Sequence, residues 1–180
     1  MTPTETLKHE HQIILLVLEA AEREAGAIRQ SGRFDAAKVH KFLDFFREFV
    51  DRCHHFKEEK HLFPQMEGAA PESAGPISMM LREHQEGRRL LGALAASVEK
   101  PDAASAAKVS EGLLAYADLL RQHIFKEDNV LYPLTDRVLD EEDRQALAEG
   151  FAMVESQEMG EGTHEKYHQL AHELAGAHCP

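Results

Sequence analysis

The sequence predicts an all-α protein: an antiparallel up-and-down four-helix bundle made of a duplicated helix hairpin, with a short helical C-terminal extension. Apolar residues recur with a helical period along almost the whole chain, and short turn segments separate the periodic stretches. No stretch of useful length alternates as a strand would. We expect residues 1–135 to form the bundle and residues 136–180 to pack on it within the same domain.

Two long helices form the first predicted hairpin. The first is expected over residues 4–30 and ends at Ser31-Gly32. The second begins at Asp35, whose carboxylate suits a helix N-cap, and runs to about residue 66. Pro64 is expected to bend or end this second helix, because proline lacks the amide hydrogen of a helix interior.

The second predicted hairpin repeats this plan after a loop at residues 68–76, a segment rich in Gly, Ala and Pro. The helices expected after this loop span residues 77–98, 103–132, 140–153 and 163–177. A turn at Lys100-Pro101-Asp102 joins the first two of them, and Gly160-Glu161-Gly162 separates the two short helices of the extension.

Composition narrows the possible partners. The 180 residues carry 32 acids against 20 bases, and this net charge of -12 disfavours nucleic acid and anionic membrane surfaces. No apolar run is long enough to span a membrane, and the N-terminus lacks the pattern of a signal peptide. The two cysteines, Cys53 and Cys179, make no disulfide framework. We therefore expect a cytoplasmic protein, a monomer or a homodimer.

Polar residues interrupt the apolar seam of every predicted bundle helix. Counted from the connecting turns at ~1.5 Å per residue, they fall at one level of an up-and-down bundle. Buried carboxylates are costly unless they are paired or bind a metal. Imidazoles and carboxylates together suit iron, manganese or zinc. The sequence therefore predicts a two-metal site made by His11, His54, Glu58, His84, His123 and Glu127.

An internal repeat supports this set. The segment His54–Pro64 aligns without gaps on His123–Pro133 with six identities in eleven positions, and Glu10-His11-Gln12 recurs as Glu83-His84-Gln85. Each half of the chain thus carries one histidine followed by a His-x-x-x-Glu motif.

The repeat also favours one assignment over its neighbours. It selects His54 with Glu58 over the adjacent pair His55 with Glu59, and it selects His11 over His9. A ferritin-like Glu-x-x-His scheme is a further alternative, but it ignores the duplicated hairpin.

These motifs resemble the hemerythrin-like (HHE cation-binding) family over about residues 4–135, and they are similar to the di-iron domain of iron–sulfur cluster repair proteins. The resemblance implies that the six residues bind two iron ions joined by an oxo or hydroxo bridge, with Glu58 and Glu127 as bridging ligands. Manganese or zinc is the alternative. It implies a non-haem di-iron protein that binds, senses or detoxifies O2, peroxide or NO, with iron donation in cluster repair as the alternative.

The chain departs from the oxygen-carrying hemerythrins at two points. Arg88 stands where those proteins have a further histidine, and the last motif has Glu127 at i+4 rather than Asp at i+5. His164 and His168 are therefore candidates for an additional metal ligand or for a place just outside the ligands. The segment His164-Glu165-x-x-His168 also has the spacing of zinc peptidases, which leaves a zinc-binding structural or peptidase-like protein as a further alternative.

Overall fold

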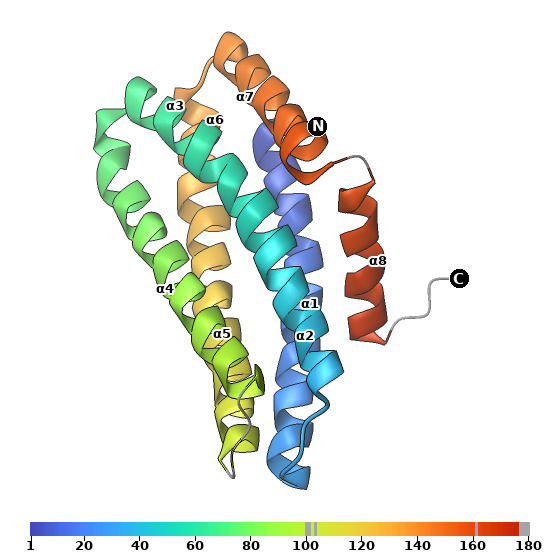
Figure 1. Cartoon of the computed structure of the whole chain (residues 1–180). Helices are drawn as coiled ribbons and strands as arrows, with labels where there is room; N and C mark the ends of the chain where they lie inside the picture. The colour runs from blue at the N-terminus through green and yellow to red at the C-terminus, as the bar shows by residue number, and fades with distance from the viewer. Residues whose placement is uncertain (100–101, 103, 161, 177–180) are drawn as a thin grey trace.

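The computed structural model describes residues 1–99, 102, 104–160 and 162–176, and these residues form helices and no strand. Four long rods run antiparallel, with the first beside the fourth and the fourth beside the third (Figure 1). This arrangement confirms the predicted all-α four-helix bundle.

The first and third rods are single helices, and the other two contain π-helical segments. The first rod is α1 (Pro3–Ser31) and the third is α4 (Ala74–Glu99). The second rod consists of α2 (Ala36–Phe45), η1 (Phe46–His55), η2 (Glu58–Leu62) and α3 (Phe63–Ala69). The fourth consists of α5 (Ser105–Lys126), η4 (Glu127–Leu131) and α6 (Tyr132–Val138).

Local sequence explains where the first helices begin and end. The Thr2 hydroxyl accepts a hydrogen bond from the Glu5 amide while the Glu5 carboxylate accepts one from the Thr2 amide, which is a complete capping box. Gly32 ends α1 in the left-handed conformation, with φ 67°, where glycine has no steric penalty. The Asp35 carboxylate accepts hydrogen bonds from two amides at the start of α2, as the sequence predicted.

Helical structure continues further than the sequence predicted. Instead of a loop over residues 68–76, α3 reaches Ala69, a 3-10 turn η3 covers Pro71–Ser73, and α4 begins at Ala74. Pro64 lies in the first turn of α3, where its missing amide hydrogen costs little, so the rod continues. The fourth rod likewise passes the expected end at residue 132 and reaches Val138.

Some expected features lie outside the described residues. They are most of the turn Lys100-Pro101-Asp102, the expected helix start at Ala103, Glu161, the expected helix end at Ala177, and Cys179.

Among the described residues, the core consists of two apolar clusters with a polar layer between them. On α1, Leu7 belongs to one cluster and Ile14 to the other, and His11 lies between them. On the fourth rod, Ile124 belongs to the same cluster as Ile14 and Leu131 to the same cluster as Leu7, and Glu127 lies between them. The polar residues that interrupt the seams therefore share one level of the bundle, enclosed by apolar side chains.

Three π-helical segments occur at this level. η1 ends at His55, η2 begins at Glu58, and η4 begins at Glu127. A π segment changes the angular register of the side chains that follow, and such segments are frequent at functional sites. Here the consecutive residues His54 and His55 each supply a donor atom to the polar layer.

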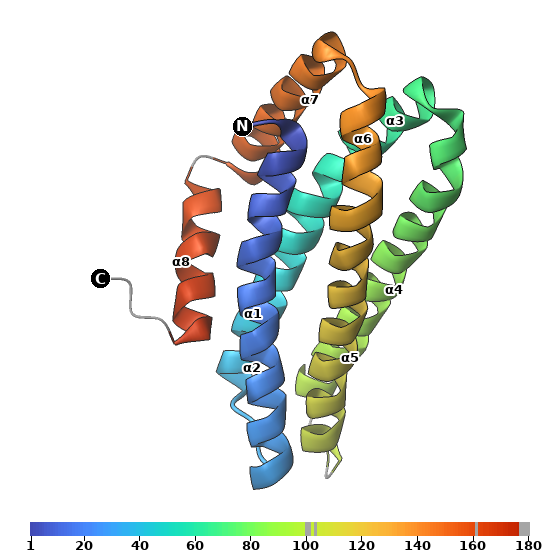
Figure 2. The same cartoon turned by 180° about the vertical axis from the view of Figure 1, so that it is seen from behind.

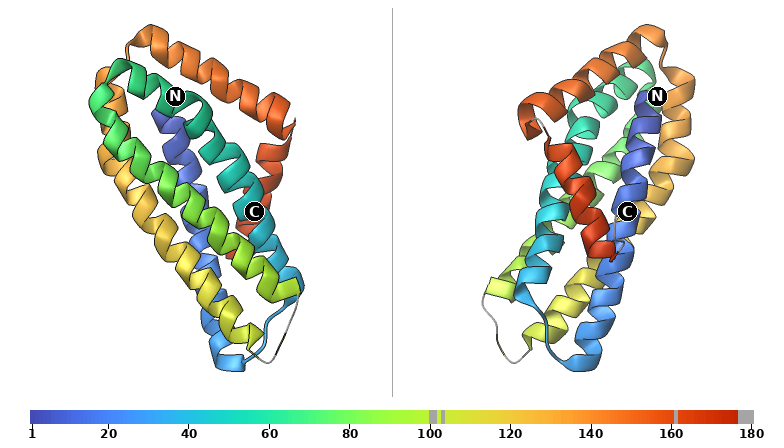
Figure 3. Two further views of the ribbon diagram at one scale, coloured as in Figure 1. Left: turned by 60° about the vertical axis from the view of Figure 1, so that its left-hand side comes forward. Right: turned by 90° about the vertical axis from the view of Figure 1, so that its right-hand side faces the viewer.

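The extension comprises α7 (Glu141–Met153), η5 (Val154–Met159) and α8 (Thr163–Ala175). Figure 2 and Figure 3 show α8 lying along α1, with α7 crossing the end of the bundle at which α1 begins. Tyr167, Ala171 and Leu174 of α8 join the larger apolar cluster. Among the described residues, no helix is both long and apolar enough to cross a membrane.

Candidate metal centre

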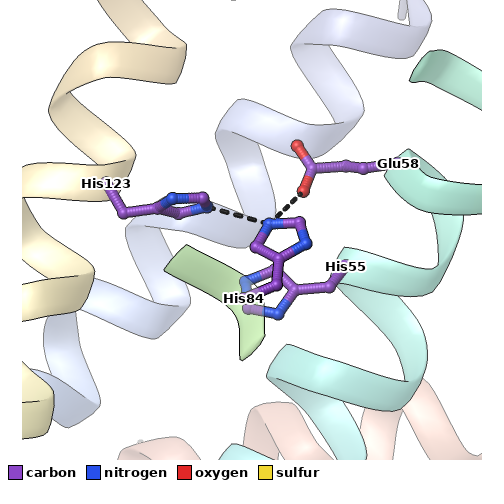
Figure 4. A group of neighbouring side chains, drawn as sticks. All are labelled: His55, Glu58, His84 and His123. Carbon is purple, nitrogen blue, oxygen red and sulfur yellow. Dashed lines mark hydrogen bonds and ion pairs between the residues drawn. The ribbon is translucent and has the colours of Figure 1, made fainter. Parts of the chain in front are cut away.

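The structure brings all six predicted residues together from the four rods. Each is at most 1% exposed. Together with the buried His55, they form two groups, and within each group all ligand atoms lie within 4.8 Å of one another. One group, drawn in Figure 4, is His55, Glu58, His84 and His123; the other is His11, His54 and Glu127.

The two glutamates lie between the groups. Glu127 Oε1 is 3.0 Å from His123 Nε2, and Glu127 Oε2 is 3.3 Å from His11 Nε2. Glu58 Oε2 is 3.4 Å from His84 Nε2 and 3.9 Å from His54 Nε2. Glu127 therefore offers one oxygen to each group, as a bridging ligand would, whereas Glu58 approaches both groups through Oε2 alone.

Carboxylates orient all five imidazoles. Each ring faces a carboxylate oxygen with its Nδ1, so its Nε2 points toward the centre. We call the five Asp and Glu residues that supply these oxygens the outer carboxylates. The pairs are His11 with Asp128 and His54 with Glu10, each at 2.8 Å, His84 with Glu59 at 2.8 Å, His123 with Glu83 at 2.9 Å, and His55 with Asp51 at 3.4 Å.

The inward-facing atoms fit a metal site better than a metal-free polar core. His11 Nε2 and His54 Nε2 face each other at 3.0 Å, and His84 Nε2 and His123 Nε2 at 3.1 Å. Because each Nδ1 donates a hydrogen bond to a carboxylate, the Nε2 of a neutral ring carries a lone pair. Two such lone pairs that face each other repel unless a cation lies between them. In addition, within the part of the chain that the structure describes, buried atoms of three residues at this centre have no hydrogen-bond partner, which costs free energy unless a cation binds them. They are Glu58 Oε2, both carboxylate oxygens of Glu127 and His55 Nε2.

The local electrostatics favour positive charge. Burial alone would lower the pKa of His11, but Asp128 and Glu127 outweigh burial and raise it to about 9. Burial also opposes protonation of His123, yet Glu127 and Glu83 raise its pKa to about 10. For Glu127, burial raises the pKa, but His123 and His11 hold it well below its ordinary value. The cluster is thus organised to hold protons or metal cations.

His55 is the residue that sequence reasoning did not include. Burial and the neighbouring His84 and His123 lower the pKa of His55 well below its ordinary value, so the ring is neutral, as a metal ligand must be. Its ring stacks on His84 with centroids 3.8 Å apart. The π segment explains its position, and a signal existed: the repeat has His55 where the second half has Ile124.

Arg88 stands where the oxygen-carrying hemerythrins have a further histidine, and it contacts carboxylates outside the centre. Its Nε donates to Asp51 Oδ1 at 2.9 Å, and its Nη2 donates to Glu59 Oε1 at 2.8 Å. Those two carboxylates hold His55 and His84. Arg88 therefore braces two outer carboxylates, and Glu59 lies among them rather than in the centre.

The histidines of the extension lie outside both groups. His164 Nε2 is 3.6 Å from Glu10 Oε1, and its ring centroid is 4.6 Å from that of His168. Glu10, Glu155 and His164 form a third possible metal group. The ammonium of Lys57 already contacts both of its carboxylates, at 2.6 Å from Glu155 Oε1, and supplies the cation there.

The peptidase-like spacing gains no third ligand. Within the described part of the chain, no group of three metal-ligating side chains contains both His164 and His168. His9, the alternative to His11, is exposed and lies beside His168, with ring centroids 5.9 Å apart.

The fold and the polar layer together define a carboxylate- and histidine-lined helical bundle. The chain belongs to the hemerythrin family, because the model of the hemerythrin HHE cation binding domain matches residues 2–135. The family resemblance drawn from the motifs is therefore confirmed, and membership implies a metal site.

Two curated relatives illustrate the range of similarity. The iron-sulfur cluster repair protein YtfE of Escherichia coli is 30% identical over 132 residues, which cover 70% of this chain and 59% of that protein. The uncharacterised protein Rv1995 of Mycobacterium tuberculosis is 25% identical over 167 residues, which cover 89% of this chain and 64% of that protein. The chain thus spans 59–64% of the length of these relatives. No solved structure matches it.

Proposed function

We propose that this chain is a non-haem di-iron protein that binds, senses or detoxifies a small molecule, namely O2, peroxide or NO. The observation that carries the proposal is the position of Glu58 and Glu127, each within reach of imidazoles of both donor groups. The proposed ligands are His11, His54, His55, Glu58, His84, His123 and Glu127. The same donors also suit manganese or zinc.

Two redox-active ions held together would supply electrons to a small bound molecule. The protein would hold the metal ions, orient the side chains that bind them and exclude other molecules. The outer carboxylates fix the direction of each imidazole, and the apolar clusters above and below keep out water and bulky substrates. Of the three tyrosines, Tyr132 lies at the centre: its hydroxyl donates to Glu58 Oε1 at 2.6 Å and holds that carboxylate in place.

A second candidate is iron donation in iron–sulfur cluster repair. The similarity to a relative named as an iron-sulfur cluster repair protein supports it. This role requires iron that leaves the site when a client protein is present, whereas the first requires iron that stays. We place either role in the cytoplasm, with no nucleic acid or membrane partner, in a monomer or homodimer.

The test is to purify the protein from iron-supplemented cells without chelator and to measure metal content and the near-UV and visible spectrum. We expect about two irons per chain, with oxo-bridge charge-transfer bands that bleach on reduction. Glu127→Gln should lose iron and bands, whereas Glu111→Gln, an exposed glutamate on α5, should keep both. Zinc alone, or iron retained by Glu127→Gln, would contradict the di-iron proposal.

A further inference from the structure

A narrow cavity reaches the proposed metal centre from the face formed by α4, α5 and η1. Its volume is about 10 Å³, which is about the space that one water molecule needs. The buried rings of His55, His84 and His123 line it, together with the apolar side chains Tyr116 and Leu120. Arg88, which is 40% exposed, lies where this lining meets solvent.

Gly87 creates this space. It lies one turn after His84, and a Cβ added there would be 3.5 Å from Tyr116 Cε2, so the absence of a side chain leaves the gap open. The matching residue of the first half, three positions after His11, is Ile14, which is 1% exposed and fills its place in the core. The repeat therefore opens the bundle on one side and closes it on the other.

The extension covers the opposite side. There, Lys57 and Glu10 are 0% and 1% exposed, beneath Glu155 and His164. Their counterparts in the second half, Lys126 and Glu83, are 33% and 18% exposed. The extension thus covers the centre on its own side, whereas the cavity lies on the side that the extension leaves uncovered.

We propose that small molecules reach the centre through this cavity, and that Gly87 sets the size of what passes. The proposal rests on the function proposed above. The small volume and the apolar wall of Tyr116, Leu119 and Leu120 favour uncharged molecules of two or so heavy atoms, because an ion would lose most of its hydration on the way in. At the rim, Arg88 is already paired with Asp51 and Glu59, so these groups together carry excess negative charge that repels anions.

The experiment narrows the cavity in two steps, first with the small side chain of alanine and then with the larger, branched side chain of valine. Gly87→Ala and Gly87→Val are compared with Gly92→Val, on the same helix, where a Cβ would meet nothing within 4 Å. The rate of NO association with the reduced, iron-loaded proteins is measured by stopped flow. Gly87→Val should slow association about tenfold or more, Gly87→Ala less, and Gly92→Val not at all. Iron content and visible spectra should match those of the wild type.

Three outcomes would overturn the proposal. The first is an unchanged NO association rate in an iron-loaded Gly87→Val protein. The second uses the metal-free protein: Gly87→Ala should unfold at a temperature no lower than Gly92→Ala, and a lower Tm would show that no space exists beside Tyr116. The third is a wild-type protein that holds iron but binds no NO or O2, which removes the proposed function and the route with it.

Discussion

The two halves of the bundle repeat the same hydrogen-bonded arrangement but bury it to different depths. In the first half, Glu10 accepts from His54 Nδ1 and from Lys57 Nζ. In the second half, Glu83 accepts from His123 Nδ1 and Lys126 Nζ in the same way. Only the first set is covered by the extension, whose Glu155 also binds Lys57. The repeat thus determines the geometry of these hydrogen bonds. Residues outside the repeat determine how far each half is shielded from solvent.

A second difference concerns the fifth imidazole. His55, Asp51 and Arg88 form a polar set whose repeat counterparts are Ile124, Leu120 and Leu15. The change is coordinated, because a buried imidazole needs a partner for its Nδ1 and the partner carboxylate in turn needs a cation.

The largest expected effect comes from replacing the lysine that pairs with the glutamate in each half. Lys57→Met leaves the buried carboxylate of Glu10 without its cation and should lower the free energy of unfolding by about 3–5 kcal/mol. Lys126→Met removes a partly exposed partner of Glu83 and should cost about 0–1 kcal/mol. Urea unfolding of the metal-free proteins measures both. Equal losses of unfolding free energy in the two variants would show that the extension does not shield the Glu10–Lys57 pair from solvent.

The sequence predicted the fold and six converging residues because both depend on periodicity and on the repeat. Helical spacing placed His11 and Glu127 at one level, and the duplicated motif selected His54 over a shift of register. His55 stayed an alternative to His54, because consecutive residues of an α-helix point in different directions and the π segment in η1 is not visible in the sequence. The one sequence signal was the repeat, which has Ile124 at the position that matches His55.

The position of the extension was also beyond the sequence. His164 and His168 were candidates for extra ligands, but their spacing says nothing about which bundle residue they meet. The structure places His164 beside Glu10, which contacts His54, and so outside the centre. Tertiary packing of α8 on α1 decides this contact.

The next largest effect concerns the contact between Glu155 of the extension and Lys57 of the bundle. Glu155→Gln keeps the shape of the side chain but removes the charge paired with Lys57, and should lower the free energy of unfolding by about 1.5 kcal/mol. Partial exposure of Glu155 keeps this loss below that of Lys57→Met. Glu158→Gln, an exposed glutamate of the same segment, is the control and should leave stability unchanged. If both variants unfold alike, Glu155 does not couple the extension to the bundle.

A smaller effect compares the aromatic residues of the two repeats. Tyr132 stacks on His11 and donates to Glu58, whereas its counterpart Phe63 stacks on His84 and has no hydroxyl. Tyr132→Phe should cost about 1 kcal/mol of stability and shift the visible bands of the loaded protein, because Glu58 loses a hydrogen bond. Leu134→Ala, a partly buried residue two positions on, should affect stability without the spectral shift. Unchanged bands in Tyr132→Phe would separate the hydroxyl from the centre.

The smallest effect sets the scale of a charge pair outside the centre. Two hydrogen bonds of 2.8 Å join Arg121 of α5 to Glu22 of α1, and Arg121 holds the pKa of Glu22 below its ordinary value. A lowered folded-state pKa adds stability that is complete above the unfolded-state pKa of about 4.3 and is lost as the pH falls through the folded value. Glu22→Gln should therefore lower the free energy of unfolding by about 0.2–1 kcal/mol at neutral pH, less in high salt, with the difference from wild type vanishing in acid. Urea titrations of the metal-free proteins at several pH values measure it, and iron content should not change. A loss that persists in acid would mean that packing, not charge, joins α1 to α5 there. The losses measured for Lys57→Met and Lys126→Met would then also have to be divided between packing and charge.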